Sequence, residues 1–439
     1  MTYHVGQVLE LTTGDVANGG WCVARPPASA GADAGPVVFV RHALPGERVR
    51  ARVTEMAARF ARADAVEVLT PSPDRVEAPC PVARPGGCGG CDWQHARLPA
   101  QRALKASVIA QQLRRLAGID RDVTVEPIPA GEPSSAGPGL AWRTRVQFAV
   151  RADGVAGLRA HRSHEVIDVG ECLIAHPSIT SLNVTRRRWP GAESVEALAG
   201  PAERAVIVSG GRSTAFLDGE PAESVLIRGD DPPGPPAARG RAGGLTPLRG
   251  RGYLTQHAAG RDWRVSAGSF WQVHPGAADA LADAVLAALE PKPGDVALDL
   301  YCGAGLFGGV LAEVVAPDGV VIGVEGNAAA VRDARHNLRD RARIHRGDVS
   351  AVLRRGDLPL ARLVVADPPR AGLAREVIDY LAGPGAERFA YVSCDPATLA
   401  RDIGLLLARG WELTELRAFD AFPMTHHVEC VATLTRASG

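Results

Sequence analysis

The sequence has almost no lysine: Lys105 and Lys292 are the only two among 49 basic residues, so arginine carries the positive charge. It has no net charge either, because 49 acidic residues balance the basic ones. A chain without excess charge can bind nucleic acid only through local patches, and arginine suits phosphate and base contacts. The composition therefore excludes a protein that binds nucleic acid through a large overall positive charge. It is compatible with one that binds through local patches.

The sequence also lacks an apolar run of the roughly 20 residues that a membrane-spanning helix needs. Its first residues, Met1 to Gln7, lack the charged-then-apolar pattern of a secretory signal. We therefore expect a cytoplasmic protein that acts as a monomer without a membrane partner. Eight cysteines in that compartment indicate metal binding or catalysis rather than disulfides. A chain of 439 residues has room for about two to four domains.

Residues 1–72 have the pattern of a small β-barrel. Five short apolar or alternating segments, separated by glycine and proline turns, predict five strands. Six arginines in this region either bind RNA phosphates or form an ordinary solvated face, and both interpretations fit the composition equally well. They are Arg41, Arg48, Arg50, Arg52, Arg59 and Arg62.

Residues 73–262 begin with a cysteine-rich segment. Cys80, Cys88 and Cys91 lie among glycines and prolines, which let the backbone fold back so that three thiols can converge. Cys172 is the nearest candidate for a fourth ligand, since Cys22 falls in the predicted barrel. By spacing alone, four thiolates fit structural zinc and an iron–sulfur cluster about equally, with no metal as a third option.

The rest of this segment predicts a helix over 97–118 and a β-rich unit from 141 onward. Arginines alternate there with Trp142 and Phe148, which suits single-stranded RNA, although ordinary strand alternation explains the pattern as well. These arginines are Arg143, Arg145, Arg159 and Arg162. Residues 228–251 are rich in Gly, Pro, Ala and Arg, which predicts a flexible surface insertion.

Residues 263–439 alternate strands and helices, as in a doubly wound α/β sheet. A strand over 296–301 runs into a glycine turn, and the next strand, 320–324, is followed by Glu325. A carboxylate at that place binds ribose hydroxyls in nucleotide folds. The turn is Gly303-Ala-Gly305 rather than GxGxxG, which favours S-adenosylmethionine (SAM) over a dinucleotide.

Further polar residues follow the predicted strands, and they should share one rim of the sheet. Asp299, Asp348 and Asp367 are three of them, and Cys394 is the fourth. Cys394 lies between a strand and a helix that opens at Pro396, where a lowered pKa and a thiolate are favoured. Packing of a small buried thiol is the alternative. Glu429 starts the last predicted strand, either as a structural residue or as a base.

Several motifs together resemble the RNA uridine-5-methyltransferases that carry an iron–sulfur cluster, the group typified by the ribosomal RNA enzymes. The N-terminal pattern resembles a TRAM domain, an RNA-binding barrel. The other motifs are Ser269-Phe-Trp-Gln272, Leu298-Asp-Leu-Tyr-Cys-Gly303, Asp367-Pro-Pro-Arg370, Ser393-Cys-Asp-Pro-Ala-Thr-Leu-Ala-Arg401 and His426-His-Val-Glu429. The resemblance implies a SAM-dependent methyltransferase sheet at 263–439, preceded by a TRAM-like barrel at 1–72 and a central domain at 73–262 that binds the cluster and RNA.

The resemblance also implies roles for individual residues. Cys394 would be the nucleophile and Glu429 the base. The matching SAM-binding positions are Gln272, Tyr301, Leu306, Glu325 and Asp367, and the matching ligands of a [4Fe-4S] cluster are Cys80, Cys88, Cys91 and Cys172. Cys80 and Cys88 are separated by seven residues here, where the family pattern has five.

The implied activity is methyl transfer from SAM to carbon 5 of a uridine in structured RNA. Ribosomal RNA is the favoured substrate and transfer RNA the alternative. An N-methyltransferase is a first rival, because Asp-Pro-Pro loops also bind exocyclic amines. A second rival is an RNA-binding protein that uses this scaffold without catalysis.

Overall fold

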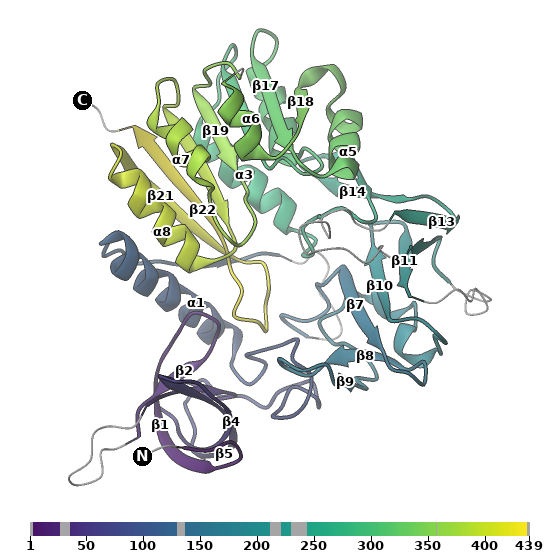
Figure 1. The fold of residues 1–439 in the computed structure, drawn as a ribbon, viewed down its shortest axis with the longest axis vertical. Coiled ribbons are helices and arrows are strands. Elements are labelled where there is room, and N and C mark those ends of the chain that lie inside the picture. Colours follow the sequence, from purple (N-terminus) through teal and green to yellow (C-terminus); the bar gives the residue numbers. More distant parts are fainter. Residues whose placement is uncertain are drawn as a thin grey trace.

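The computed structural model describes residues 3–26, 36–129, 137–210, 221–229, 244–356 and 358–436. Figure 1 shows a small barrel at one end, a β-rich unit beside the centre, and a large sheet flanked by helices at the other end. The predicted architecture, a doubly wound α/β sheet with an N-terminal barrel, is confirmed. Among the described helices, none has the length and apolarity that crossing a membrane requires.

The barrel is closed, with the strand order β1-β2-β3-β5-β4. Its strands are β1 (Val8–Val16), β2 (Cys22–Ala24), β3 (Val37–Arg41), β4 (Arg48–Met56) and β5 (Phe60–Thr70). Along β4, buried Val49 and Ala51 alternate with exposed arginines, because successive side chains of a strand point to opposite faces. Arg48 pairs with Glu10 and Arg50 with Glu67, each at 2.8 Å, so these two arginines belong to a paired outer face.

The segment after the barrel packs on the large sheet rather than on the central one. It contains α1 (Leu98–Gln112), a π-helical turn η1 (Leu113–Ala117) and strand β6 (Val125–Pro127). β6 pairs in parallel with the last-but-one strand of the chain, and Ile109 and Leu113 lie in the core of that sheet. The predicted helix over 97–118 thus corresponds to α1 and η1 together. The predicted boundary at residue 73 stays a prediction.

The central unit is a seven-stranded sheet with the order β13-β12-β11-β10-β7-β8-β9. A hairpin of two further strands follows it. The bounds are β7 (Arg145–Val150), β8 (Ala156–Arg159), β9 (Val166–Ile167), α2 (Pro177–Thr180), η2 (Val184–Arg186), β10 (Ser194–Ala199), β11 (Arg204–Ser209), β12 (Ser224–Arg228), β13 (Leu245–Arg249), β14 (Tyr253–Ala258) and β15 (Arg261–Ser266).

The predicted flexible insertion over 228–251 is wrong at its C-terminal part. Leu245–Arg249 forms β13, which pairs antiparallel with β12 at the edge of the central sheet. A composition rich in glycine and proline did not prevent this pairing, because an edge strand tolerates Pro247 where a ladder hydrogen bond is not needed. Residues 230–243, the middle of the insertion, lie outside the described part of the chain.

The large sheet has eight strands in the order β18-β17-β16-β19-β20-β22-β21-β6. β16 to β20 pair in parallel with one another, and β22 runs antiparallel to both β20 and β21. The bounds are α3 (Ala277–Leu289), β16 (Val296–Leu300), α4 (Leu306–Val315), β17 (Val320–Glu325), α5 (Ala328–Leu338), η5 (Arg339–Arg341), β18 (Arg343–Arg346), α6 (Val349–Arg355), β19 (Leu363–Ala366), α7 (Arg375–Ala382), β20 (Arg388–Ser393), α8 (Pro396–Leu407), β21 (Trp411–Asp420) and β22 (Glu429–Arg436).

Each face of this sheet has its own core, because alternate strand residues point to opposite sides. Phe389 and Tyr391 of β20 lie in the core formed with α1, α7 and α8. Ala390 and Val392 lie in the opposite core, formed with α3 and α4. Because helices cover both faces of the sheet, polar side chains that must reach solvent or a ligand lie at the ends of its strands.

Candidate active site

The carboxyl ends of the parallel strands meet at one edge of the large sheet. Asp299 is the last-but-one residue of β16, and Glu325 is the last residue of β17. Asp367 follows β19 directly, and Cys394 follows β20. β16 pairs with both β17 and β19, so the connection order reverses at this point, where ligands bind in open α/β sheets. The structure therefore brings these predicted residues to one rim.

Cys394 and Glu429 face each other across two antiparallel strands. The register pairs Ser393 of β20 with Cys430 of β22, which places the residue after Ser393 opposite the residue before Cys430. Residues directly opposite in an antiparallel pair have Cβ atoms about 5 Å apart. The side chain of Glu429 is buried, with 5% of its surface exposed. Burial raises the pKa of Cys394, and the charge of nearby Glu429 raises it further.

The expected lowered pKa of Cys394 is wrong for the ligand-free site. Burial raises the pKa of this thiol to about 11, and Glu429 and Asp367 add to the rise. The helix that follows does not compensate, because Asp395 takes up its free amides: Oδ1 accepts hydrogen bonds from Ala397 N and Thr398 N at 3.0 and 2.8 Å. A neutral thiol is thus the resting form at neutral pH.

Arg370 opposes this rise in the pKa of Cys394, and sequence reasoning gave it no role beyond its motif. Its guanidinium group lowers that pKa through a hydrogen bond and through its charge. The same charge lowers the pKa of Glu429, although burial and Asp367 together keep that pKa well above its usual value. A sequence signal could have identified Arg370. It is a positively charged residue in a loop after a strand, where several neighbouring strands end in acidic residues.

The rim concentrates carboxyl groups that are costly to ionise together. Burial raises the pKa of Asp367 to about 7 and that of Asp299 to about 8, the latter opposed by Gly308 and reinforced by Asp367 and Glu325. Asp299 Oδ2 accepts a hydrogen bond from Gly308 N at 2.7 Å, whereas Oδ1 has no hydrogen-bond partner among the described residues. Such a site favours a cationic ligand, and the sulfonium of SAM is one.

Glu325 and the glycine turn are already held in place. Glu325 Oε2 accepts from Gly303 N at 3.0 Å, and Oε1 accepts from Asn327 N at 2.6 Å. Tyr301, in the same turn, has a left-handed φ of 62°. The Leu306 side chain is only 8% exposed and packs in a core, so any contact of Leu306 at the rim comes from its backbone at the start of α4.

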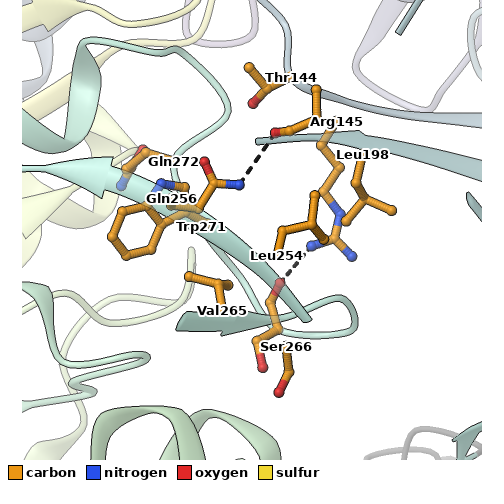
Figure 2. Close-up of a pocket in the computed structure, with 11 residues that line it drawn as sticks. Thr144, Arg145, Leu198, Leu254, Gln256, Val265, Ser266, Trp271 and Gln272 are labelled. Atoms are coloured by element: carbon orange, nitrogen blue, oxygen red, sulfur yellow. Dashed lines mark hydrogen bonds between the residues drawn. The ribbon is translucent and has the colours of Figure 1, made fainter. Parts of the chain in front are cut away.

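Gln272 lies where hairpin β14–β15 meets the central sheet, in the small pocket of Figure 2. The next residue is anchored there, because Thr144 donates to Val273 O from both its backbone N and its hydroxyl, at 2.8 and 2.9 Å. Figure 2 also shows Arg145 extending across the pocket, where Nη1 donates to Ser269 O at 2.5 Å. Arg145 is paired with Glu196 as well, so its contacts here are structural.

The four predicted metal ligands line one cavity of about 380 Å³ between the cysteine-rich loop and the central sheet. Gly90 N donates to Cys88 Sγ at 3.4 Å, and burial raises the pKa of Cys88, Cys91 and Cys172. Across the described ranges, no three His, Cys, Asp or Glu side chains lie close enough to hold a metal ion. The thiols of Cys80, Cys88, Cys91 and Cys172 therefore surround a shared space without converging on one point.

Models of three known families match three parts of the chain. Residues 4–66, which form the barrel, match the model of the TRAM domain. Residues 356–437, from β19 to the end of β22, match the model of tRNA (uracil-5-)-methyltransferases. Residues 274–357, around the glycine turn, match the model of protein-L-isoaspartate(D-aspartate) O-methyltransferases.

Relatives match over the whole length. The chain is 51% identical to an uncharacterized RNA methyltransferase of Streptomyces avermitilis, over 99% of both chains. It is 50% identical to one of Streptomyces coelicolor, over 99% of this chain and 94% of the other. The fold matches that of the Pyrococcus abyssi tRNA (uracil-54, C5)-methyltransferase, solved with S-adenosyl-L-homocysteine, with a TM-score of 0.72 at 22% identity, over 97% of this chain and 99% of that one. The chain therefore belongs to the SAM-dependent RNA uracil-5-methyltransferases that carry a TRAM domain.

Proposed function

We propose that this protein methylates carbon 5 of a uridine in structured RNA, with ribosomal RNA favoured, through a covalent intermediate between Cys394 and the uracil ring. The observation that carries the proposal is the position of Cys394 opposite Glu429 at the edge of the parallel strands. A nucleophile on one strand and a carboxyl group on the next can act on the two adjacent carbons of one ring. Neither an N-methyltransferase nor a silent RNA-binding protein needs that pair.

In the first step, Cys394 Sγ gives up its proton to solvent water, and the thiolate adds to carbon 6 of the uracil. The ring electrons move onto the carbonyl oxygen at carbon 4, and the resulting enolate makes carbon 5 nucleophilic. The Cys394 proton is costly to remove in the free protein, because the pKa of this thiol is about 11. Arg370 and the sulfonium of bound SAM are the positive charges that favour the thiolate.

In the second step, carbon 5 takes the methyl group from the sulfonium, and S-adenosylhomocysteine is the other product. In the third step, Glu429 removes the proton from carbon 5. The electron pair of that bond re-forms the double bond between carbons 5 and 6, and the Cys394 thiolate leaves. Burial raises the pKa of Glu429, so once ionised its carboxylate is a stronger base than an ordinary one.

For the methyl donor we propose contacts from Gln272, Tyr301, Glu325 and Asp367, with Leu306 contributing its backbone. Glu325 supports this assignment, because it closes the glycine turn in the manner of a ribose-binding carboxylate. Asp367 supports it because a carboxyl group with a pKa of about 7 gains from a neighbouring cation. The target uridine must leave its stack to reach this rim, at a cost of a few kcal/mol.

A transfer RNA substrate is the second candidate. It is favoured by the family model that matches residues 356–437, which is described as acting on tRNA, and by the tRNA substrate of the Pyrococcus abyssi protein. The TRAM barrel supports RNA binding in either case. We expect the protein to act in the cytoplasm as a monomer.

We further propose that Cys80, Cys88, Cys91 and Cys172 hold a [4Fe-4S] cluster. The four thiols line one cavity, and a multi-iron cluster needs thiolates spread around it rather than drawn onto one ion. Backbone N–H groups such as Gly90 N already point at sulfur, as cluster sites require. When bound, the cluster would tie the cysteine-rich loop to the Cys172 turn. Anaerobically purified protein should contain about four iron atoms and four sulfides per chain, and zinc alone would contradict this assignment.

The methylation mechanism is tested by trapping its intermediate. Glu429→Gln protein incubated with SAM and total cellular RNA should form a stable protein–RNA adduct, because the methylated ring cannot lose its proton. The double variant with Cys394→Ala should form none. Sequencing the trapped RNA distinguishes ribosomal from transfer RNA. Methyl transfer that survives Cys394→Ala would contradict the mechanism and favour an N-methyltransferase.

A further inference from the structure

The loop that presents Glu429 is held from outside the methyltransferase sheet. It spans residues 421–428 between β21 and β22, and in Figure 1 it extends from the sheet toward the centre of the molecule. At its tip Met424 has a left-handed φ of 69°. A residue other than glycine keeps this backbone conformation when contacts with its surroundings hold it there. What fixes it here is the segment that follows Cys91.

Three hydrogen bonds join the backbone of Met424 to this segment. Asp92 N and Trp93 N both donate to Met424 O, at 2.9 and 3.0 Å. The first turn of α1 supplies the third, where Gln101 Oε1 accepts from Met424 N at 2.8 Å. Gln101 is fully buried, so these bonds are shielded from water. The backbone at the tip of the loop is therefore defined by residues next to the cysteine cavity.

Asp92 adds a side-chain contact closer to Glu429. Its Oδ2 accepts from His426 N at 3.2 Å and lies 2.6 Å from His426 Nδ1. Arg41 of the barrel lies 3.7 Å from the other carboxylate oxygen. His426 is three residues before Glu429, and the side chain of Asp92 is only 12% exposed. The largely buried carboxylate of Asp92 thus connects the cysteine-rich loop to the barrel and to the loop that leads into Glu429.

We propose that Asp92 is a positioning residue that holds Glu429, through His426, in place for removal of the carbon 5 proton. The inference rests on the proposed function and assigns the cysteine-rich loop a part in one chemical step. Cys394 is placed by β20 and α8, whereas Glu429 is reached through the loop that Asp92 holds. Loss of Asp92 should therefore slow the last step and leave the first two.

The test uses the readout that a general loss of structure would not produce. In Asp92→Ala the covalent protein–RNA adduct should accumulate in the presence of SAM, as in Glu429→Gln, while wild-type protein shows none at steady state. A misplacement of about 1 Å at a reacting group costs up to about 100-fold in rate, so kcat should fall about 10- to 100-fold. KM for RNA should change less than about twofold, because no RNA contact is removed.

The matched control is Asp74→Ala, which removes a carboxylate from the same segment. Asp74 pairs with Arg97 and is more exposed than Asp92. Asp74→Ala should retain wild-type turnover and form no adduct. Iron content is measured in all variants, so that an effect through the cysteine cavity is recognised. His426→Asn serves as the second variant if Asp92→Ala does not fold, and it should accumulate adduct in the same way.

The outcomes separate this inference from the function on which it rests. An adduct in Asp92→Ala, with iron retained and Asp74→Ala normal, supports the inference. If Glu429→Gln traps an adduct but neither Asp92→Ala nor His426→Asn does, the inference is overturned and the proposed function stands. A fall in adduct formation equal to the fall in turnover also overturns it. If Glu429→Gln itself traps nothing, the proposed function fails first.

Discussion

The catalytic rim and the cysteine cavity both gather thiols, but they are built in different ways. The rim is made of strand ends: strand register fixes the backbone at Cys394 and Glu429, and the loop that leads into Glu429 is held by Asp92 through His426. The cavity is made of two loops, one carrying Cys80, Cys88 and Cys91 and the other carrying Cys172. A single bridge between Cys88 and Ala160 ties the first loop to the central sheet next to the ligands. The rim is thus preorganised by strand pairing, whereas the cavity is enclosed mainly by loops.

The charged groups that act on the thiol pKa values also differ between the two sites. Burial raises the thiol pKa in both, and in the rim the neighbouring carboxylates Glu429 and Asp367 raise it further. Each site also carries an opposing cation, Arg370 in the rim and Arg143 in the cavity, but only in the cavity do several thiols raise one another's pKa. A rim variant should therefore change chemistry, and a cavity variant should change stability.

The largest effect should come from Cys394→Ala, which removes the nucleophile. Methyl transfer should fall at least about 1,000-fold, while the free energy of unfolding stays within about 1 kcal/mol of wild type, since only a half-buried thiol is lost. Cys88→Ala is the paired variant in the cavity, and it should lose iron and lower the melting temperature. Thermal melts and methylation assays on both variants test this difference between the two sites. A larger loss of stability in Cys394→Ala than in Cys88→Ala would contradict it.

Arg370→Ala should give the next largest effect, because it removes the charge that favours the thiolate. The pKa of Cys394 should rise above 11, and methyl transfer should fall about 10- to 100-fold. The pH dependence of alkylation of the Cys394 peptide, followed by mass spectrometry, measures the pKa. Arg375→Ala is the control, since Arg375 is exposed on α7 and pairs with Asp379. An unchanged alkylation profile in Arg370→Ala would show that burial alone sets the thiol pKa.

A smaller effect should appear in the pH dependence of ligand binding. Asp367 and Asp299, with pKa values of about 7 and 8, are largely protonated at pH 6 in the free site. A cation favours their ionised forms, so SAM binding releases protons and its affinity should rise with pH up to about 8. S-adenosylhomocysteine lacks the charge, so the ratio of the two affinities should rise up to about tenfold per pH unit. Calorimetry measures it, and a constant ratio would exclude this coupling.

The smallest effect should come from the barrel, through Gly20→Ala. Gly20 has a φ of 82°, and a Cβ there would lie 2.7 Å from His426 Cβ, so the substitution displaces the loop before Glu429. Turnover should fall a few-fold more than in Gly6→Ala. Gly6 has a similar φ of 88° but nothing within 4 Å of an added Cβ, so it controls for backbone strain alone. Equal turnover in the two variants would show that the barrel does not act on the loop.

The residues of the rim could be predicted because each follows a local pattern. A short apolar strand that ends in a turn places Glu325, Asp367 and Cys394 at strand ends, although a role for Cys394 needed the other motifs as well. The closed barrel followed from alternation and turn residues in the same way. The proximity of Cys80, Cys88 and Cys91 followed from their spacing, since the glycines between them permit the fold-back, whereas Cys172 was added only as the remaining candidate.

What could not be predicted depends on contacts between distant parts of the chain. Burial raises the pKa of Cys394, and Glu429 and Arg370, which come from other parts of the chain, act on it in opposite directions. The contact of Asp92 with His426 joins residues 334 positions apart, and no local pattern signals it. β13 was missed because its composition resembles that of the residues before it, and only its pairing with β12 makes it a strand.

Strand β6 has a consequence for how the protein is made. Glu126 of this strand pairs with Arg417 of β21, which leaves the ribosome 291 residues later. At 5 to 20 residues per second, that interval is roughly 15 to 60 s. During that interval, Ile109 of α1 and Val125 of β6 lack the sheet that covers them, and a fragment that starts at residue 263 would leave the edge of β21 unpaired, which favours aggregation. The catalytic sheet is thus begun before the central sheet is synthesised and completed only after it, which makes the nascent chain a natural client for chaperones.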